Sequence, residues 1–383
     1  MLITVKLRLR DKHAAELNRQ ARAVNFVWNY VNETTRKAWT RDRRWLSNYD
    51  MQKLTSGSSK DLQLSSGTIE RVCATHAASR SAQKVAGLRW RARKSLGWIP
   101  FKKDTVSFDG ASVVFRSMDF EPMHLNPRLK VGATISAGSF NADARGRWYV
   151  NLPVEVDCAD RAPVSRVGID LGLASLATLS NGQKVQARRF YRNSEAVLAT
   201  AQRARKEPKR IRNIHAKVAN RRRDFLHKAS ARIAKEYGLI VIGDISSSKI
   251  VQTKFAKSTL DAGWSDFKGM LSYKAIMHGG SAIEVNERNS SRTCSGCGAI
   301  PVSSPKGMGA LRIREWSCDD CGAVHDRDVN AAVNILRVGL DTLAEGAIGG
   351  RSASPSRPTG AANPQEIVRR STRQALQGEQ HDD

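Results

Sequence analysis

Hydrophobic and polar residues follow a different pattern in each part of the chain. Residues 1–7 alternate with the period of two of a β-strand, whereas residues 12–94 carry apolar positions at helical spacing, interrupted by a polar connection at 46–66. Short alternating runs separated by turn residues return over 98–156, among them two-residue runs within 130–135. This order predicts a small β-barrel with a helical region inserted after its first strand.

The second half of the chain has the pattern of an α/β domain. Residues 166–180 predict a strand, a turn and a second strand, and the apolar runs 239–242 and 282–285 predict two further buried strands. A helix is expected over 327–340. The residues beyond it are dominated by Ser, Pro, Gly, Arg and Gln, and we expect a disordered tail.

The charge of the chain indicates its partners. Lys and Arg number 63 against 36 Asp and Glu, which gives a net charge of +27 in 383 residues. A surface this cationic attracts polyanions, so nucleic acid is the expected partner. No run of about eighteen apolar residues is present, and the strand-like start does not have the pattern of a signal peptide. We therefore expect a cytoplasmic protein without a membrane partner.

Positive charge is concentrated between residues 187 and 235, where sixteen Lys or Arg stand against three acids. The segment predicts a helical hairpin, and the basic side chains on it are suited to neutralising a phosphate backbone. The residues predicted to bind nucleic acid are Arg203, Arg205, Lys209, Arg210, Arg212, Arg221, Arg222, Arg223 and Lys228.

Four of the six cysteines have the spacing of a zinc ribbon. Two Cys-x2-Cys pairs, Cys294 with Cys297 and Cys318 with Cys321, are separated by twenty residues. Each pair can form a tight knuckle whose thiolates converge on one tetrahedral ion, and a reducing cytoplasm argues against disulfides. The spacing therefore predicts a structural zinc site.

Acidic residues at the ends of predicted elements are candidates for a second metal site. Asp170 lies at the end of an apolar strand, and Asp328 lies in the first turn of the helix behind the cysteines, where Asp326 is the expected helix cap. Hydrolysis of a phosphodiester by two divalent cations needs carboxylates that converge from different elements. An RNase H-like sheet would bring a strand-end acid and a helix acid together.

Four blocks in order give the chain a family resemblance. Asp170, then 220–228 (NRRRDFLHK), 291–298 (SRTCSGCG) and 325–332 (HDRDVNAA), resemble the TnpB proteins, the RNA-guided nucleases of bacterial insertion sequences that are related to compact type V CRISPR effectors. The match is tight from 165 to 340 and otherwise rests on the order of elements.

The resemblance implies an α+β multidomain protein. It consists of an RNase H-like (RuvC) α/β domain with an inserted zinc ribbon, and a small wedge-like β-barrel with an inserted helical recognition lobe. The implied boundaries are 1–11 and 96–160 for the barrel, 12–95 for the recognition lobe, 165–290 and 323–342 for the split RuvC-like domain, 291–322 for the zinc ribbon and 343–383 for a disordered tail.

The resemblance also implies partners and cofactors. They are a guide RNA from the element's end, target double-stranded DNA beside a short motif that the protein reads, structural zinc, and two catalytic magnesium ions. Base pairing would read the target while the protein holds its backbone. The expected place of action is the bacterial cytoplasm, on the nucleoid when DNA is bound. The oligomeric state leaves no mark in the sequence.

One position departs from the family pattern. TnpB-like proteins usually have a glutamate where this chain has Gly243, and glycine offers no ligand. Three interpretations stay open: Glu287 from the neighbouring strand end supplies the carboxylate, Asp244 supplies it after a local change of backbone, or the centre is inactive. We take Asp170, Glu287 and Asp328 as the magnesium ligands, with Asp244 as the alternative to Glu287.

The expected function is that of a Mg-dependent, RNA-guided DNA endonuclease of a transposable element, which cleaves by two-metal hydrolysis. The main alternative is a nuclease-dead, RNA-guided repressor on the same scaffold. A transposase that joins DNA strands uses a similar fold and acidic triad, but the zinc ribbon just before the last acid argues against it.

Overall fold

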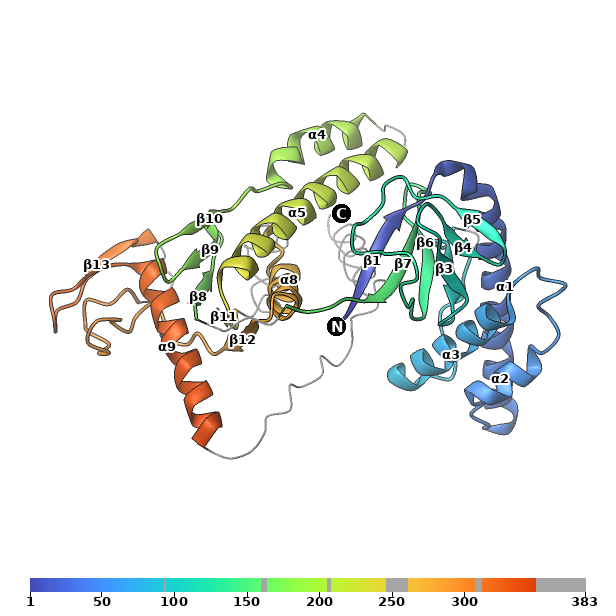
Figure 1. Cartoon of the computed structure of the whole chain (residues 1–383), viewed down its shortest axis with the longest axis horizontal. Helices are drawn as coiled ribbons and strands as arrows, with labels where there is room; N and C mark the ends of the chain where they lie inside the picture. Colours follow the sequence, from blue (N-terminus) through green and yellow to red (C-terminus); the bar gives the residue numbers. More distant parts are fainter. Residues whose placement is uncertain (93, 160–163, 205–207, 246–260, 307–311, 349–383) are drawn as a thin grey trace, which may run out of the picture. The chain divides into compact units, whose positions relative to one another are not determined.

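The structure is a computed structural model, and it describes residues 1–92, 94–159, 164–204, 208–245, 261–306 and 312–348 (Figure 1). The chain forms two compact units. The first comprises Met1–Pro163, Arg188–Gly238 and Ile250–Ser281, and the second comprises Val164–Ala187, Leu239–Lys249 and Ala282–Asp383. The tail expected to be disordered lies outside the described residues, except for 343–348, which belong to the last helix. No helix within the described ranges is long and apolar enough to cross a bilayer.

The predicted helical region of the first unit consists of three helices. They are α1 (Ala14–Asp42), α2 (Asn48–Leu54) and α3 (Ser66–Gln83), and a short 3-10 turn, η1 (Asp11–His13), precedes them. α1 buries Leu17, Ala21 and Val24 on one face, as the helical spacing predicts. α2 begins with a reciprocal capping box between Ser47 and Asp50, which satisfies two backbone donors at the helix start. The helical prediction is therefore confirmed for α1 and α3, but it was wrong in two places: α2 lies inside the connection predicted at 46–66, and the described residues 84–92, predicted to be helical, are not.

The strands of the first unit form two sheets. A four-stranded sheet has the order β1 (Leu2–Arg8), β7 (Trp148–Glu155), β6 (Gly138–Ala142) and β2 (Trp98–Phe101), and a three-stranded sheet has the order β3 (Val106–Phe108), β4 (Val113–Phe115) and β5 (Met118–Phe120). β1 pairs antiparallel with β7 from Leu2↔Glu155 to Arg8↔Tyr149. The first strand of the chain thus pairs with the last strand of this region, and the helices lie between them in sequence.

The strand prediction within 130–135 was wrong. Residues 130–133 form a turn, in which the Ala133 N–H donates to the Lys130 carbonyl and Gly132 has a φ of +75°. Only Ile135 makes a β contact there, as an isolated bridge to Val154. Two alternating residues do not distinguish a strand from a turn, because one apolar side chain can be buried in either.

Three further helices of the first unit carry the basic segment and its partner. They are α4 (Arg192–Arg203), α5 (Pro208–Glu236) and α8 (Trp264–Met277). α8 packs on α5, and the buried Lys274 donates from Nζ to the His227 carbonyl at 2.6 Å and to Ser230 Oγ at 2.8 Å. Burial lowers the pKa of Lys274 to about 8.

The second unit is built on a five-stranded sheet. Its order is β10 (Lys184–Gln186), β9 (Ser175–Leu179), β8 (Arg166–Leu171), β11 (Leu239–Gly243) and β12 (Ser281–Val285). β8 and β11 are parallel, whereas β9 is antiparallel to β8. β9 and β11 are buried at every position, as expected for strands covered on both faces. These strands confirm the predictions for 166–180, 239–242 and 282–285.

A long helix packs on this sheet. α9 (Arg327–Ile348) follows the hairpin of β13 (Glu315–Ser317) and β14 (Val324–Asp326), and it contacts β8, β11 and β9. It extends beyond the predicted end at residue 340. A β-carbon at Gly168 on β8 would lie 2.0 Å from the Ala332 carbonyl oxygen of α9. Glycine is therefore required at 168 if helix and strand are to approach this closely.

We predict that Gly168→Ala destabilises the protein. The added methyl group would meet backbone atoms of α9, and overpacking of this kind costs about 1–3 kcal/mol. The matched control is Gly269→Ala in the middle of α8, where a β-carbon would have no neighbour within 4 Å. Because alanine has the higher helix propensity, this substitution should raise the free energy of unfolding by up to about 1 kcal/mol. Thermal unfolding measures both. A Gly168→Ala protein as stable as the parent would contradict the close packing.

Candidate active site and cysteine cluster

Three carboxylates of the second unit come from three different elements. Asp170 is near the end of β8, Glu287 follows β12, and Asp328 lies in the first turn of α9. In the parallel pair of β8 and β11, Ile169 lies opposite Ile242, so the next residues, Asp170 and Gly243, lie side by side. Alternation along a strand then places a side chain at 243 on the same face of the sheet as Asp170.

Glu287 occupies the space beside Gly243. A β-carbon built on Gly243 would lie 2.5 Å from Glu287 Oε2, 3.2 Å from Glu287 Cβ and 3.1 Å from Ile335 Cδ1. The 2.5 Å distance is too short for a side chain at 243 to coexist with Glu287 in this conformation, and the other two distances are tight. With a side chain at position 243, the end of the flexible Glu287 side chain would have to move from its present place.

Asp244 has a different position and different partners. Its carboxylate is exposed, and its Oδ1 accepts the backbone N–H of Glu287 at 3.3 Å. Its own N–H donates to the Val285 carbonyl at 2.9 Å. The strand alternation that puts a residue at 243 on the face of Asp170 puts Asp244 on the other face. Asp244 therefore holds the backbone that carries Glu287.

The negative charges of the other two acids affect the pKa of Asp170, although the three carboxylates are not gathered as tightly as the cysteine sulfurs described below. The pKa of Asp170 is raised well above its ordinary value, first by burial and then by the negative charges of Glu287 and Asp328. Arg327 and Arg314 act in the opposite direction and only partly offset this effect. A site that gathers like charges in this way favours either a bound proton or a bound cation.

Asp328 is paired with an arginine that the sequence pattern did not identify. Arg314 Nη1 donates to both carboxylate oxygens of Asp328, at 3.1 and 3.2 Å. Arg314 precedes Asp328 by fourteen residues and lies outside every motif, so only the fold reveals the pair. A cation that is to bind Asp328 has to compete with this guanidinium.

Asp326 is the helix cap that the sequence predicted. Its Oδ1 accepts the backbone N–H groups of Asp328 and Val329, both at 3.0 Å, and its Oδ2 receives Lys184 Nζ at 2.7 Å. These bonds lower its pKa against the opposing effect of burial. The cap fixes the first turn of α9, which carries Asp328.

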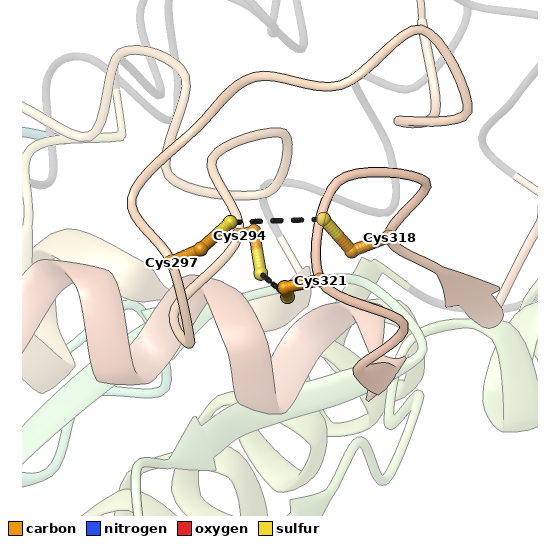
Figure 2. A group of neighbouring side chains, drawn as sticks. All are labelled: Cys294, Cys297, Cys318 and Cys321. Carbon is orange, nitrogen blue, oxygen red and sulfur yellow. Dashed lines mark hydrogen bonds between the residues drawn. The ribbon is translucent and has the colours of Figure 1, made fainter.

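The four paired cysteines converge, as Figure 2 shows. Their sulfur atoms all lie within 4.8 Å of one another, with Cys294 Sγ 3.6 Å from Cys321 Sγ and Cys297 Sγ 3.7 Å from Cys318 Sγ. Four thiolates about 2.3 Å from one zinc ion stand roughly 3.8 Å apart at the corners of a tetrahedron, so the cluster fits zinc. Within the described ranges it is the only group of three or more potential metal ligands gathered this tightly.

His325 links the cysteine cluster to α9. Its Nε2 lies 3.0 Å from Cys294 Sγ, and its ring centroid lies 4.9 Å from that of Trp316, at a tilt of 40°; Trp316 lies opposite it in the β13–β14 hairpin. A ring N–H donated to a thiolate would stabilise the ionised form of Cys294. His325 thus lies beside the cluster while the four sulfurs supply the complete ligand set.

The basic residues predicted to bind nucleic acid lie on α4 and α5 of the first unit. Arg203, Lys209, Arg210, Arg212, Arg221, Arg223 and Lys228 are exposed. Arg222 is half-buried and lies 3.8 Å from Asp261, while Lys228 pairs with Asp224 one turn away. Arg205 lies outside the described residues. Most of this charge faces solvent, where it can meet a polyanion.

The sequence is similar to known proteins along its whole length. Residues 150–253 match the family model described as "Probable transposase", and residues 264–335 match "Cas12f1-like, TNB domain". A Streptomyces pristinaespiralis protein described as "Putative RNA-guided DNA endonuclease" is 32% identical over 393 residues, which cover 94% of each chain.

Two further relatives match parts of the chain. "Putative RNA-guided DNA endonuclease InsQ" of Escherichia coli K12 is 28% identical over 230 residues, which cover 52% of this chain and 56% of that protein. "TnpB-like protein L79" of Acanthamoeba polyphaga mimivirus is 30% identical over 147 residues, which cover 37% of this chain and 27% of that protein.

We predict that the cysteine cluster binds zinc. The purified protein should contain about one zinc ion per chain, and Cys318→Ser should remove most of it and lower the thermal midpoint, because a tetrahedral site loses a thiolate. Cys158→Ser is the matched control, since Cys158 is exposed and outside the cluster. Elemental analysis measures the metal. Unchanged zinc content in Cys318→Ser would refute the assignment.

We also predict that Asp170→Asn stabilises the protein in the presence of a chelator. Because the folded-state pKa of Asp170 is raised, ionisation disfavours the folded state as the pH rises from the ordinary carboxylate range through that pKa. The asparagine side chain of the variant carries no charge at any pH, so the variant does not lose this stability as the pH rises. The gain in thermal midpoint should be absent in acid, grow with pH and then level off. A gain in thermal midpoint that is independent of pH would show that ionisation of Asp170 does not destabilise the folded state.

Proposed function

The chain belongs to the TnpB family, and from that premise we propose that it is an RNA-guided, Mg-dependent DNA endonuclease of a transposable element. The observation that carries this proposal is the position of Glu287, whose carboxylate lies against Gly243, the residue next to Asp170 across the β8–β11 pair. Glu287 would thereby complete the acidic set although the usual glutamate position is a glycine.

The proposal includes an assignment of domains. The sheet β10-β9-β8-β11-β12 with α9 would form the split RuvC-like domain over 165–290 and 323–342, with the zinc ribbon at 291–322. Residues 1–11 and 96–160 would form the wedge-like barrel, and 12–95 the recognition lobe. The pairing of β1 with β7 across the helical insertion supports the barrel assignment.

Asp170, Glu287 and Asp328 are the residues that would hold magnesium, since carboxylate oxygens are the ligands that this ion prefers. Bound there, two magnesium ions would supply an activated water and stabilisation of the leaving oxygen. The raised pKa of Asp170 supports a cation site, because the gathered negative charges are relieved by a cation. Asp328 becomes available to it when the Arg314 ion pair is exchanged.

Guide RNA and target DNA are the proposed partners. Curated relatives are described as RNA-guided DNA endonucleases, and the exposed basic residues of α4 and α5 would meet the phosphate backbones. Base pairing would select the target next to a short motif read by the protein. The net charge of +27 suits a protein that holds several nucleic-acid strands together.

Cleavage of a matched duplex tests the proposal. The protein with its guide RNA and Mg²⁺ should cut the target, and Asp170→Ala and Glu287→Ala should each reduce the rate by more than about a hundredfold while target binding persists, because each removes a metal ligand. Glu284→Ala is the matched control, since Glu284 is an exposed acid on β12 three residues away and should leave cleavage unchanged.

Other outcomes identify the alternatives. If Asp244→Ala abolishes cleavage while Glu287→Ala does not, Asp244 is the third ligand and the relocation is wrong. If the parent binds its matched target and never cuts it, the protein is an RNA-guided repressor, and the nuclease assignment fails.

A further inference from the structure

We propose that Asn330 and Asn334 of α9 are positioning residues, which hold the loop after β12 so that the Glu287 carboxylate stays beside Gly243. The inference rests on the proposed function of Glu287 as a metal ligand. Both asparagines are almost completely buried, with 2% and 3% of their surface exposed, and they lie one helical turn apart. The TnpB resemblance includes Asn330 in a motif without giving its side chain a task.

The side-chain amides of Asn330 and Asn334 donate hydrogen bonds to the same two backbone carbonyl groups. Asn334 Nδ2 donates to the Ser290 carbonyl at 2.8 Å and to the Thr293 carbonyl at 2.7 Å. Asn330 Nδ2 donates to the same carbonyls at 3.3 and 2.8 Å. Asn330 Oδ1 also accepts the N–H of Ser295, which follows Cys294. We call Asn330 and Asn334 the asparagine clamp.

The clamp reaches Glu287 through a single intermediate residue. The N–H of Ser290, whose carbonyl the clamp holds, donates to the Glu287 carbonyl at 3.0 Å. The N–H of Glu287 donates to Asp244 Oδ1 at 3.3 Å. Both backbone polar groups of Glu287 are therefore hydrogen-bonded. Its carbonyl is bonded to Ser290, which α9 holds, and its N–H is bonded to Asp244 at the end of β11.

A carboxylate in this position needs such support. At 243 a glutamate would lie on β11, whose backbone is fixed by its bonds to β8. Glu287 lies beyond the end of β12, where the ladder no longer fixes the chain. A displacement of about 1 Å in a metal ligand is enough to weaken binding, and residues that orient ligands are typically worth about 10–100-fold in metal affinity.

Asn334 is the better member of the clamp to test, because Asn330 also contacts the cysteine knuckle. Asn334→Ala removes both donors, whereas Asn334→Asp keeps the size and the acceptor for Arg337 Nη2 but turns an oxygen toward the two carbonyls. Asn32→Ala is the matched control: Asn32 is a buried asparagine of α1 whose side chain holds the backbone N–H and carbonyl of Leu88 in the first unit.

Mn²⁺ binding to the full chain with its guide RNA, followed by electron paramagnetic resonance, gives a readout besides cleavage. We expect both Asn334 variants to weaken Mn²⁺ binding about tenfold or more, in the direction of Glu287→Ala, and to raise the Mg²⁺ concentration for half-maximal cleavage. Zinc content and target binding should stay at parental values. Asn32→Ala should lower the thermal midpoint and leave Mn²⁺ affinity unchanged.

A change of background separates positioning from general stability. In the double variant Gly243→Glu/Glu287→Ala the carboxylate returns to β11, so adding Asn334→Ala should no longer change Mn²⁺ affinity. Equal weakening in both backgrounds would make Asn334 merely structural and overturn the proposal, as would loss of folding in both Asn334 variants. If Glu287→Ala itself leaves Mn²⁺ binding unchanged, the proposed role of Glu287 fails. If Glu287→Ala weakens binding and Asn334→Ala does not, only the clamp fails.

Discussion

The backbone of β8 at Gly168 lies against the backbone of α9, where a β-carbon would be 2.0 Å from the Ala332 carbonyl oxygen. A second close approach involves a glycine of α9 itself: a β-carbon on Gly339 would be 2.5 Å from Val241 Cγ1 of β11. These close approaches set the distance between α9 and the sheet. Asp328 in the first turn and the asparagines of the next turns thereby come to lie near the ends of β8, β11 and β12.

The negative charges of the acidic site beside this contact disfavour the folded state. Burial and two neighbouring carboxylates raise the pKa of Asp170, and the charges of Arg327 and Arg314 only partly offset this effect. Such gathered charge is retained where function requires it, because a packed core would avoid it. With zinc bound, the cysteine cluster of the same unit would cross-link the loops beside α9, which are otherwise joined only by the short β13–β14 hairpin.

Features that depend on sequence spacing could be predicted, and features that depend on contacts between distant segments could not. The Cys-x2-Cys pairs have their geometry built into their spacing, and Asp326 is a cap because it directly precedes a helix. Arg314 carries no local signal, because its role arises only when the hairpin brings it to Asp328. The run at 130–135 was misassigned because two residues are too few to define a period. Barrel closure and the domain boundaries stay predictions.

Gly243 leaves open the space that the Glu287 side chain occupies. A β-carbon at 243 would lie 2.5 Å from Glu287 Oε2, so with a side chain there the Glu287 carboxylate would have to turn away from its present place. A carboxylate on β11 inherits its position from the sheet, whereas one beyond β12 has to be held by separate hydrogen bonds. Asp244 provides one such bond at the Glu287 N–H, and Ser290, itself held by α9, provides another at the carbonyl. In the proposed assignment, a ligand on the loop after β12 would be oriented by a few polar side chains, whereas one on β11 would be oriented by backbone pairing.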